Sequence, residues 1–178
     1  MGIPTLIATN TEDDDATSSF TSGITSAYDE YMFVMTDIGP ANDGVEFLFQ
    51  VSTDSGSNYN VTVTSSYFSA YHDEAGSEYG TAHRTGDDQA QGTAFHRLGA
   101  DIGNGADEST AGILHLFNPA STTYVKHWYY RGIVYRQNNG VRTPFVSGYF
   151  NTTSAVDAIQ FKMSAGNMDG VIQMYGIS

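Results

Sequence analysis

The sequence predicts an all-β protein, folded as a two-sheet antiparallel sandwich of the jelly-roll kind. Strand and turn formers are plentiful, with 19 Gly, 12 Tyr and 10 Phe in 178 residues, whereas the helix formers Leu, Glu and Lys are scarce. Apolar and polar residues alternate with a period of two in many short segments, which is typical of half-buried strands. Turn formers separate these segments at fairly regular intervals, so we expect about eight to ten strands in a single domain over residues 1–178.

In the first half of the chain, the clearest alternation runs over 45–52, where Val45, Phe47, Phe49 and Val51 would face inward. The polar, acidic segment 10–15 is expected to be a loop, and 18–22 fits either a strand or a loop. The strands expected here are 4–9, 28–36, 45–52 and 59–70.

The segment 71–107 is expected to be a long, loop-rich excursion. Gly, Asp, Glu, Gln and His dominate it, and only 93–98 has the character of a short strand. Loops of this length in a compact domain are usually functional or form an interface.

The last third of the chain returns to regular alternation. Gln137-Asn138-Asn139-Gly140 predicts a hairpin turn between two strands. The final residues predict a closing β-hairpin, in which two apolar strands flank the Gly- and Asn-rich turn 164–170. The strands expected in this part are 111–117, 123–136, 143–150, 158–163 and 171–177.

Composition excludes several classes of function. The formal net charge is −13 with only seven Lys and Arg, so we expect neither nucleic acid nor an anionic membrane as a partner. The absence of cysteine excludes disulfides and thiol chemistry. No apolar run has the length of a signal peptide or a membrane span. A protein of this kind that acts outside a cell would be released by lysis.

Two motifs resemble sites but favour structural interpretations. Ser52–Tyr59 matches the S-x-D-x-G-x-x-aromatic pattern of an Asp-box, and its single occurrence predicts a hairpin turn stabilised by the Asp54 side chain. The acidic run 12–15 could attract calcium, but it lacks the ordered spacing of a calcium loop.

One cluster has the atoms for metal binding or acid–base chemistry: His72, Asp73, Glu74, His83, Asp87 and Asp88. Its spacing fits no metal motif, so a solvated loop is the favoured interpretation. We therefore expect no catalytic residue, no metal, no cofactor and no enzymatic activity.

Aromatic residues are densest around the expected strand 123–136. The period of two places Trp128 and Tyr130 on one face and Tyr129 and Tyr135 on the other. Buried aromatics would form core, and this interpretation is favoured; exposed ones would anchor a protein interface or stack on sugar rings. Trp128 and Tyr129 are the candidate glycan contacts.

Several segments resemble small virion structural proteins of tailed bacteriophages, particularly marine and cyanobacterial ones. The likeness covers nearly the whole chain and lies in turn and strand patterns: 20–24, 28–31, 52–54 with 59–61, His115–Pro119, and 158–161 with the ending Met174-Tyr175-Gly176-Ile177. The resemblance implies a virion component, either a capsid decoration protein or a domain of a fibre, and it carries no catalytic residues.

The first functional hypothesis is a capsid decoration (cement) protein. It would be a homotrimer made in the host cytoplasm, bound on the outside of the particle to the major capsid protein or other virion proteins. The contact elements would be the N-terminal residues 1–6 and the excursion 71–107, and the candidate interface residues are Ile3, Pro4, Leu6, Tyr71, His72, Tyr79 and Phe95. The alternative is a tail fibre or receptor-binding adhesin module that contacts host surface glycans.

Overall fold

The computed structural model describes residues 2–178, which form thirteen β-strands and contain no helix. Within these residues there is accordingly no helix long and apolar enough to cross a membrane. The strands are β1 (Thr5–Asp15), β2 (Ser18–Phe20), β3 (Glu30–Pro40), β4 (Val45–Ser52), β5 (Val63–Asp73), β6 (Tyr79–His83), β7 (Ala90–Gly92), β8 (His96–Ile102), β9 (Thr110–Phe117), β10 (Lys126–Arg136), β11 (Gly140–Phe150), β12 (Ala158–Met163) and β13 (Met168–Ile177).

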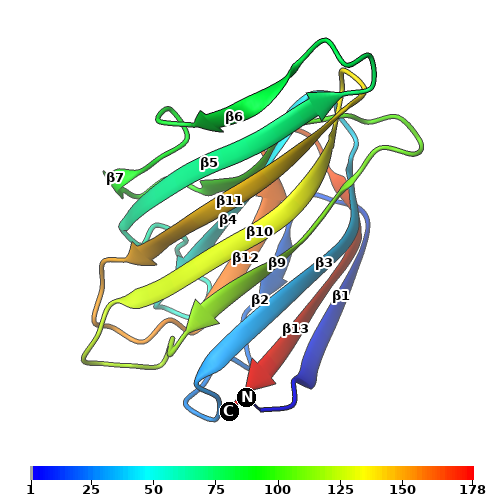
Figure 1. The fold of residues 1–178 in the computed structure, drawn as a ribbon. Helices are drawn as coiled ribbons and strands as arrows, with labels where there is room; N and C mark the ends of the chain where they lie inside the picture. Colours follow the sequence, from blue (N-terminus) through cyan, green and yellow to red (C-terminus); the bar gives the residue numbers. More distant parts are fainter. Residues whose placement is uncertain (1) are drawn as a thin grey trace.

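Eight strands form a long antiparallel row in the order β1-β13-β3-β9-β10-β11-β5-β6, with the short β7 also paired to β5. Figure 1 shows this row in the foreground, from β6 at the top to β1 at the lower right, with β4 and β12 behind it. The row is twisted, as neighbouring strands of L-amino acids are.

The remaining strands follow in the order β8-β4-β12-β2. They are joined to the long row where Arg136 at the end of β10 pairs with Ile102 of β8. The thirteen strands of residues 2–178 therefore make one nearly closed, barrel-like sheet, and all of their pairings are antiparallel.

The core lies between the long row and the strands behind it. Phe49 of β4 meets Trp128 of β10 edge-on, with ring centroids 4.9 Å apart, and Phe161 of β12 meets Phe33 of β3 at 5.7 Å. These rings are fully buried, and aromatic side chains of this size contribute most of the apolar area that a small core removes from water.

The strand predictions hold for most of the alternating segments, with ends shifted by a few residues. The expected strands 28–36, 45–52, 111–117, 123–136 and 143–150 correspond to β3, β4, β9, β10 and β11. The hairpin turn at Gln137–Gly140 is confirmed, since Arg136 pairs with Gly140 across it. The all-β class is confirmed as well.

The acidic segment 10–15 was expected to be a loop, but it forms the second half of β1. It pairs with β13, where Asn10 lies opposite Ile172 and Glu12 opposite Gly170. β13 offers a free edge there, and backbone pairing to that edge outweighs the poor strand propensity of the acidic side chains. Because β1 is itself an edge strand, its charges also discourage pairing with another chain.

The prediction of a closing hairpin is wrong, although both of its strands exist. β12 pairs with β4 and β2, whereas β13 pairs with β1 and β3. Both edges of each strand are thus occupied by strands from the N-terminal third of the chain. The turn between β12 and β13 therefore connects the set β8-β4-β12-β2 to the long row, and it does not join two paired neighbours.

The excursion 71–107 is shorter and more regular than expected. β5 continues to Asp73, β6 and β7 pair with it, and β8 occupies His96–Ile102 where a strand was expected at 93–98. Leu98 and Ile102 of β8 are fully buried, so this part of the excursion belongs to the core.

The Asp-box forms a turn but not a hairpin. Asp54 accepts hydrogen bonds from the Asn58 side chain at 2.7 Å, the Ser52 hydroxyl at 2.6 Å and the Asn58 backbone, and these bonds lower the pKa of Asp54 to about 2. The flanking strands β4 and β5 pair with different neighbours, which corrects the hairpin prediction. The motif caps the end of β4.

Candidate functional site

The solvent-facing side of β9, β10, β11 and β5 is rich in apolar and aromatic side chains. Alternation along β10 buries Trp128 and Tyr130 and leaves Tyr129 and Ile133 exposed by 42% and 60%. Phe68 of β5 is 52% exposed and Val141 of β11 is 41% exposed. We call this surface the outer face and define it by Phe68, His72, Ile113, His115, Phe117, Tyr129, Arg131, Ile133, Val141 and Phe145.

Strand register brings these residues into rows across the four strands. Ile113 lies opposite Arg131, Arg131 opposite Phe145, and Phe145 opposite Phe68. His115 and Tyr129 form the next row. Residues from four separate parts of the sequence therefore make one continuous surface.

Ring stacking holds the aromatic side chains of the outer face in place. The rings of Phe68 and Phe145 stack 5.0 Å apart and are nearly parallel, at 7°. His115 stacks on Tyr129 at 4.5 Å, and the Arg131 guanidinium lies 5.3 Å from the centre of the Phe145 ring. Side chains that are ordered in this way lose little conformational entropy when a partner covers them.

The outer face is free of carboxylates, although the chain has 20 Asp and Glu. Among the outward residues of β9, β10, β11 and β5, which the structure describes completely, none is acidic and Arg131 is the one Lys or Arg. The nearest acid in the rows is Glu30 of β3, which pairs with His115 Nδ1. Apolar patches that lack acidic side chains have the composition of the surfaces that proteins use to bind one another.

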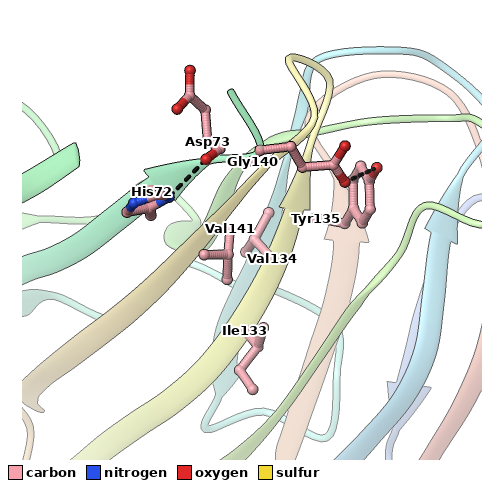
Figure 2. Close-up of a pocket in the computed structure, with 8 residues that line it drawn as sticks. His72, Asp73, Ile133, Val134, Tyr135, Gly140 and Val141 are labelled. Carbon is pink, nitrogen blue, oxygen red and sulfur yellow. Dashed lines mark hydrogen bonds between the residues drawn. The ribbon is translucent and has the colours of Figure 1, made fainter. Parts of the chain in front are cut away.

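Two shallow hollows lie on the outer face. The larger, of about 410 Å³, is lined by His72, Ile133, Tyr135 and Val141, with Asp73 and Glu74 at its edge (Figure 2). At its rim the Tyr135 hydroxyl donates to Glu74 Oε1 at 3.1 Å, and this bond raises the pKa of Tyr135. The smaller hollow, of about 260 Å³, lies among Phe68, Tyr129, Arg131 and Phe145. Such hollows accept the anchor side chains of a partner protein.

The structure does not bring the candidate interface residues together. His72 and Tyr79 lie side by side on the outer surface, with ring centroids 5.9 Å apart, whereas Tyr71 faces the other side of β5. Ile3, Pro4 and Leu6 are exposed at or near β1, the opposite edge of the row, and Met1 lies outside the described residues. Phe95 packs under Lys162, whose Nζ lies 4.3 Å from the ring centre.

Of the two candidate glycan contacts, only Tyr129 is exposed. Trp128 is 2% exposed and packs on Phe49, His96 and Phe150, so its ring cannot stack on a sugar. The favoured interpretation of the aromatic group as core applies to Trp128 and Tyr130. It does not apply to Tyr129, which belongs to the outer face.

The cluster of His72, Asp73, Glu74, His83, Asp87 and Asp88 does not form a shared centre. His83 Nε2 lies 2.8 Å from Asp88 Oδ2, while Asp73 accepts hydrogen bonds from the Ser77 hydroxyl and the Glu78 backbone, which lower the pKa of Asp73. Within residues 2–178, no group of three or more His, Cys, Asp or Glu is arranged to hold a metal ion.

Sequence reasoning missed most of the outer face: Phe68, Ile113, Arg131, Ile133, Val141 and Phe145. Their alternation with buried neighbours was a usable signal, because it places each on the face opposite to a core residue. The signal could not say which face was solvated until the pairing of β9, β10, β11 and β5 was known.

Comparison with known proteins adds no relative to this description. No protein-family model matches the chain, and no curated protein is significantly similar to it. Functional conclusions therefore depend on the geometry of the outer face and of the strands that carry it.

Proposed function

We propose that this protein is a non-enzymatic structural component of a tailed bacteriophage particle, and specifically a capsid decoration protein that docks on the major capsid protein. The observation that carries the docking role is the carboxylate-free, pre-stacked aromatic outer face. Interfaces between proteins are depleted of Asp and Glu and enriched in aromatic residues and Arg, which is the composition of this surface. The virion setting comes from the resemblance in sequence.

The size of the outer face suits such a contact. Four strands spaced about 4.8 Å apart and about seven residues long give the outer face roughly 450 Å², and the adjoining β3 and β13 extend it to roughly 650 Å², with the carboxylates of Glu30 and Asp169 in this added margin. A standard interface buries about 800 Å² on each partner. The partner surface that fits would be apolar at its centre, with an acidic group placed to meet Arg131.

The proposal also assigns the finer architecture. The long row, β1-β13-β3-β9-β10-β11-β5-β6, would be one sheet of a jelly-roll-like sandwich. The strands β8-β4-β12-β2 would be the other sheet. Two features support this division: the edge-on packing of Phe49 of β4 against Trp128 of β10, and the single residue pair, Arg136 with Ile102, that joins the two sets of strands. A homotrimer of this sandwich would cover a junction between capsid subunits.

The function would be mechanical. Each docked copy adds buried interface that exists only in the closed shell, and this raises the free energy needed to open the shell under the pressure of packaged DNA. The protein would be made in the host cytoplasm and leave on the exterior of the particle at lysis.

Copy number in purified particles tests this proposal. Quantitative mass spectrometry should find one copy for each capsid subunit, or one for every few subunits, and light scattering of the purified protein should give a trimer. A few copies per hundred capsid subunits would overturn the decoration role.

A low copy number would support the alternative, a tail fibre or adhesin module that contacts host glycans. The exposed ring of Tyr129, stacked on His115, is the feature that favours it. The shortage of hydrogen-bonding amides and carboxylates on the outer face counts against it, because sugar hydroxyls need such partners. Loss of glycan binding in Tyr129→Ala, with unchanged attachment to particles, would decide for the adhesin.

A further inference from the structure

A third hollow, of about 480 Å³, lies on the opposite side of the long row from the outer face. It is bounded by the β5–β6 hairpin and by the junction of β10 with β11, and is lined by Tyr71, Ser77, Glu78, Tyr79, Ala82, Arg84, Arg136 and Arg142. Three of the seven Lys and Arg of the chain gather here. We call this hollow the arginine pocket.

Arg142 forms part of the wall of the pocket and is held in place from behind. It projects from the inner side of β11, and its side chain is only 4% exposed. Its Nη1 donates to Asp101 Oδ2 at 2.7 Å and to the Ala100 carbonyl at 3.3 Å, while its Nε is buried without a hydrogen-bond partner among residues 2–178. A fixed guanidinium with an unused donor is prepared for a further acceptor.

Arg136 has even more unused hydrogen-bonding capacity. Its side chain is 13% exposed, and neither Nε nor Nη1 has a hydrogen-bond partner in the part of the chain that the structure describes. The carboxylates of Glu78 and Asp101 approach it only to 3.6 and 3.7 Å. Leaving buried donors unpaired is costly, so an acceptor that enters the pocket and pairs with them is favoured.

The chemistry of the pocket favours a single carboxylate as that acceptor. Guanidinium groups bind carboxylates through paired N–H bonds, and Asp101 already shows this preference by contacting Arg142 and approaching Arg136. Glu78 lies at the rim, is 57% exposed and is held by the Asn138 amide at 3.1 Å. It can swing out when another carboxylate takes its place beside Arg136.

Charge in the surrounding network limits the ligand to one negative charge. Arg84 pairs with Asp87, which also pairs with Arg97, and Arg97 reaches Glu46 as well. With Asp101 and Glu78, four guanidinium groups therefore face four carboxylates. A monoanion that displaces Glu78 keeps this balance, whereas a phosphate dianion does not.

The aromatic wall of the pocket indicates what carries the carboxylate. Tyr71 lines the hollow from the side of β5 that faces away from His72, and its ring lies against Gly80 of β6. A flat ring next to a pair of carboxylate-binding guanidinium groups suits a sugar ring, whose C–H face packs on an aromatic ring while its acid group is bound. We propose that the arginine pocket binds an acidic sugar, of the uronic or nonulosonic acid class, through Arg136 and Arg142.

Calorimetric titration of the full-length protein tests this assignment. The probes are glucuronate and N-acetylneuraminate, with glucose as the neutral match and a short peptide with a free C-terminal carboxylate as the competing class. At least one of the two acidic sugars should bind, and glucose should not. Binding should weaken as salt rises, because a charged contact contributes to it.

Two variants make the test specific to the pocket. Arg136→Gln removes one of the two guanidinium groups that would bind the carboxylate. It should weaken the affinity about tenfold or more, as expected for the loss of a charged hydrogen-bonding partner. Glu78→Gln removes the competing carboxylate and should strengthen binding severalfold. Lys162→Gln, which removes a cation beside Phe95 and outside the pocket, is the matched control and should bind as the parent does; thermal melts confirm that each variant is folded.

Three outcomes would overturn the proposal. They are no binding of either acidic sugar, equal binding of glucose, and binding that neither Arg136→Gln nor Glu78→Gln alters. Binding of the peptide alone is one form of the first outcome and would indicate a protein C-terminus as the ligand. If Arg136→Gln fails to fold, Glu78→Gln still tests the pocket, because the Glu78 side chain is exposed and its exchange should not affect folding. None of these outcomes bears on copy number in particles, so the inference and the decoration role fail separately.

Discussion

The two faces of β10 show how one strand can serve two purposes. Tyr129 and Tyr130 are adjacent in sequence and identical in type, yet Tyr130 is 1% exposed and Tyr129 is 42% exposed. Burial raises the pKa of Tyr130, whereas the Tyr129 ring stacks on His115 at the surface. The two residues have the same chemistry, and they differ only because other strands cover one face of β10 and leave the other face exposed to solvent. The inner face therefore supplies stability, and the outer face is available for binding.

The largest effect should come from exchanging a residue of the inner face. Trp128→Ala removes a ring that contacts Phe49, His96 and Phe150, and should lower the free energy of unfolding by about 3–5 kcal/mol. Tyr129→Ala on the outer face should cost under about 1 kcal/mol. Denaturant unfolding followed by circular dichroism measures both, because Trp128 is the single tryptophan and its fluorescence is lost with it. Equal costs would contradict the division of β10 into two faces.

A buried histidine behind β10 should make stability depend on pH. His96 packs on Phe49 and Trp128, with Nδ1–H donating to the Arg97 carbonyl at 2.8 Å, and Nε2 accepting from Ser65 Oγ. Burial lowers the pKa of His96 from 6.5 to about 4. The unfolded chain therefore binds a proton at a higher pH than the folded protein does. Stability should fall as pH drops from about 6.5 to about 4, by about 3 kcal/mol.

The measurement is the free energy of unfolding at several pH values for the parent and His96→Gln. The variant should be less stable than the parent at pH 7 but should lose this part of the pH dependence. Asp54 does not contribute to this slope. Its pKa is lowered from 3.8 to about 2, so the stability that its hydrogen bonds provide is lost mainly below pH 3.8, outside the range in which His96 acts. His127→Gln, an exposed histidine of β10, is the control. If His96→Gln keeps the full slope, another group is responsible.

A smaller effect on stability, but a large one on association, should follow from a charge on the outer face. Arg131→Glu places an acid in the carboxylate-free patch and loses the contact with Phe145, so attachment to particles should weaken about tenfold or more. Stability should change by less than about 1 kcal/mol. Co-sedimentation with particles measures the attachment. Lys162→Glu, which makes the same change of charge beside Phe95, is the control and should attach normally.

Local signals in the sequence sufficed for most strands of this fold and failed for its connections. Val45, Phe47, Phe49 and Val51 face the core, and in the first half of β4 they alternate with the half-buried Glu46 and Leu48; that pattern needs no knowledge of neighbours. The pairing of β13 with β1 and β3 joins the two ends of the chain, and no local pattern encodes it. The closing hairpin was therefore a reasonable prediction from neighbouring segments, and it was wrong.

The sites were harder to predict than the strands for the same reason. Tyr129 was found because aromatic residues are dense around it, but Phe68 and Phe145 meet only through the pairing of β5 with β11. The arginine pocket could not be predicted at all. Arg136 and Arg142 are close in sequence, but the carboxylate of Asp101 and the hairpin that carries Glu78 reach them through long-range pairing.

The smallest expected effect concerns the turn that sets the register of β10 and β11. Asn139 has a positive φ of 54°, which Asn tolerates and Ala does not, and its backbone accepts a hydrogen bond from Glu74 N–H at 2.9 Å. Asn139→Ala should lower the free energy of unfolding by about 1 kcal/mol, and Asn139→Gly should leave it nearly unchanged. Denaturant unfolding of the two variants measures the difference.

This turn matters because a register shift of one residue moves every side chain of a strand to the opposite face. A slipped β11 would turn Arg142 outward and Phe145 inward. Mild strain in Asn139→Ala should not cause this, because the buried rings of Phe150 and Trp128 oppose it. The variant should therefore keep both its attachment to particles and its binding of acidic sugars. If the variant lost both attachment and sugar binding while its stability fell by only about 1 kcal/mol, the turn rather than the core would determine the register of β11.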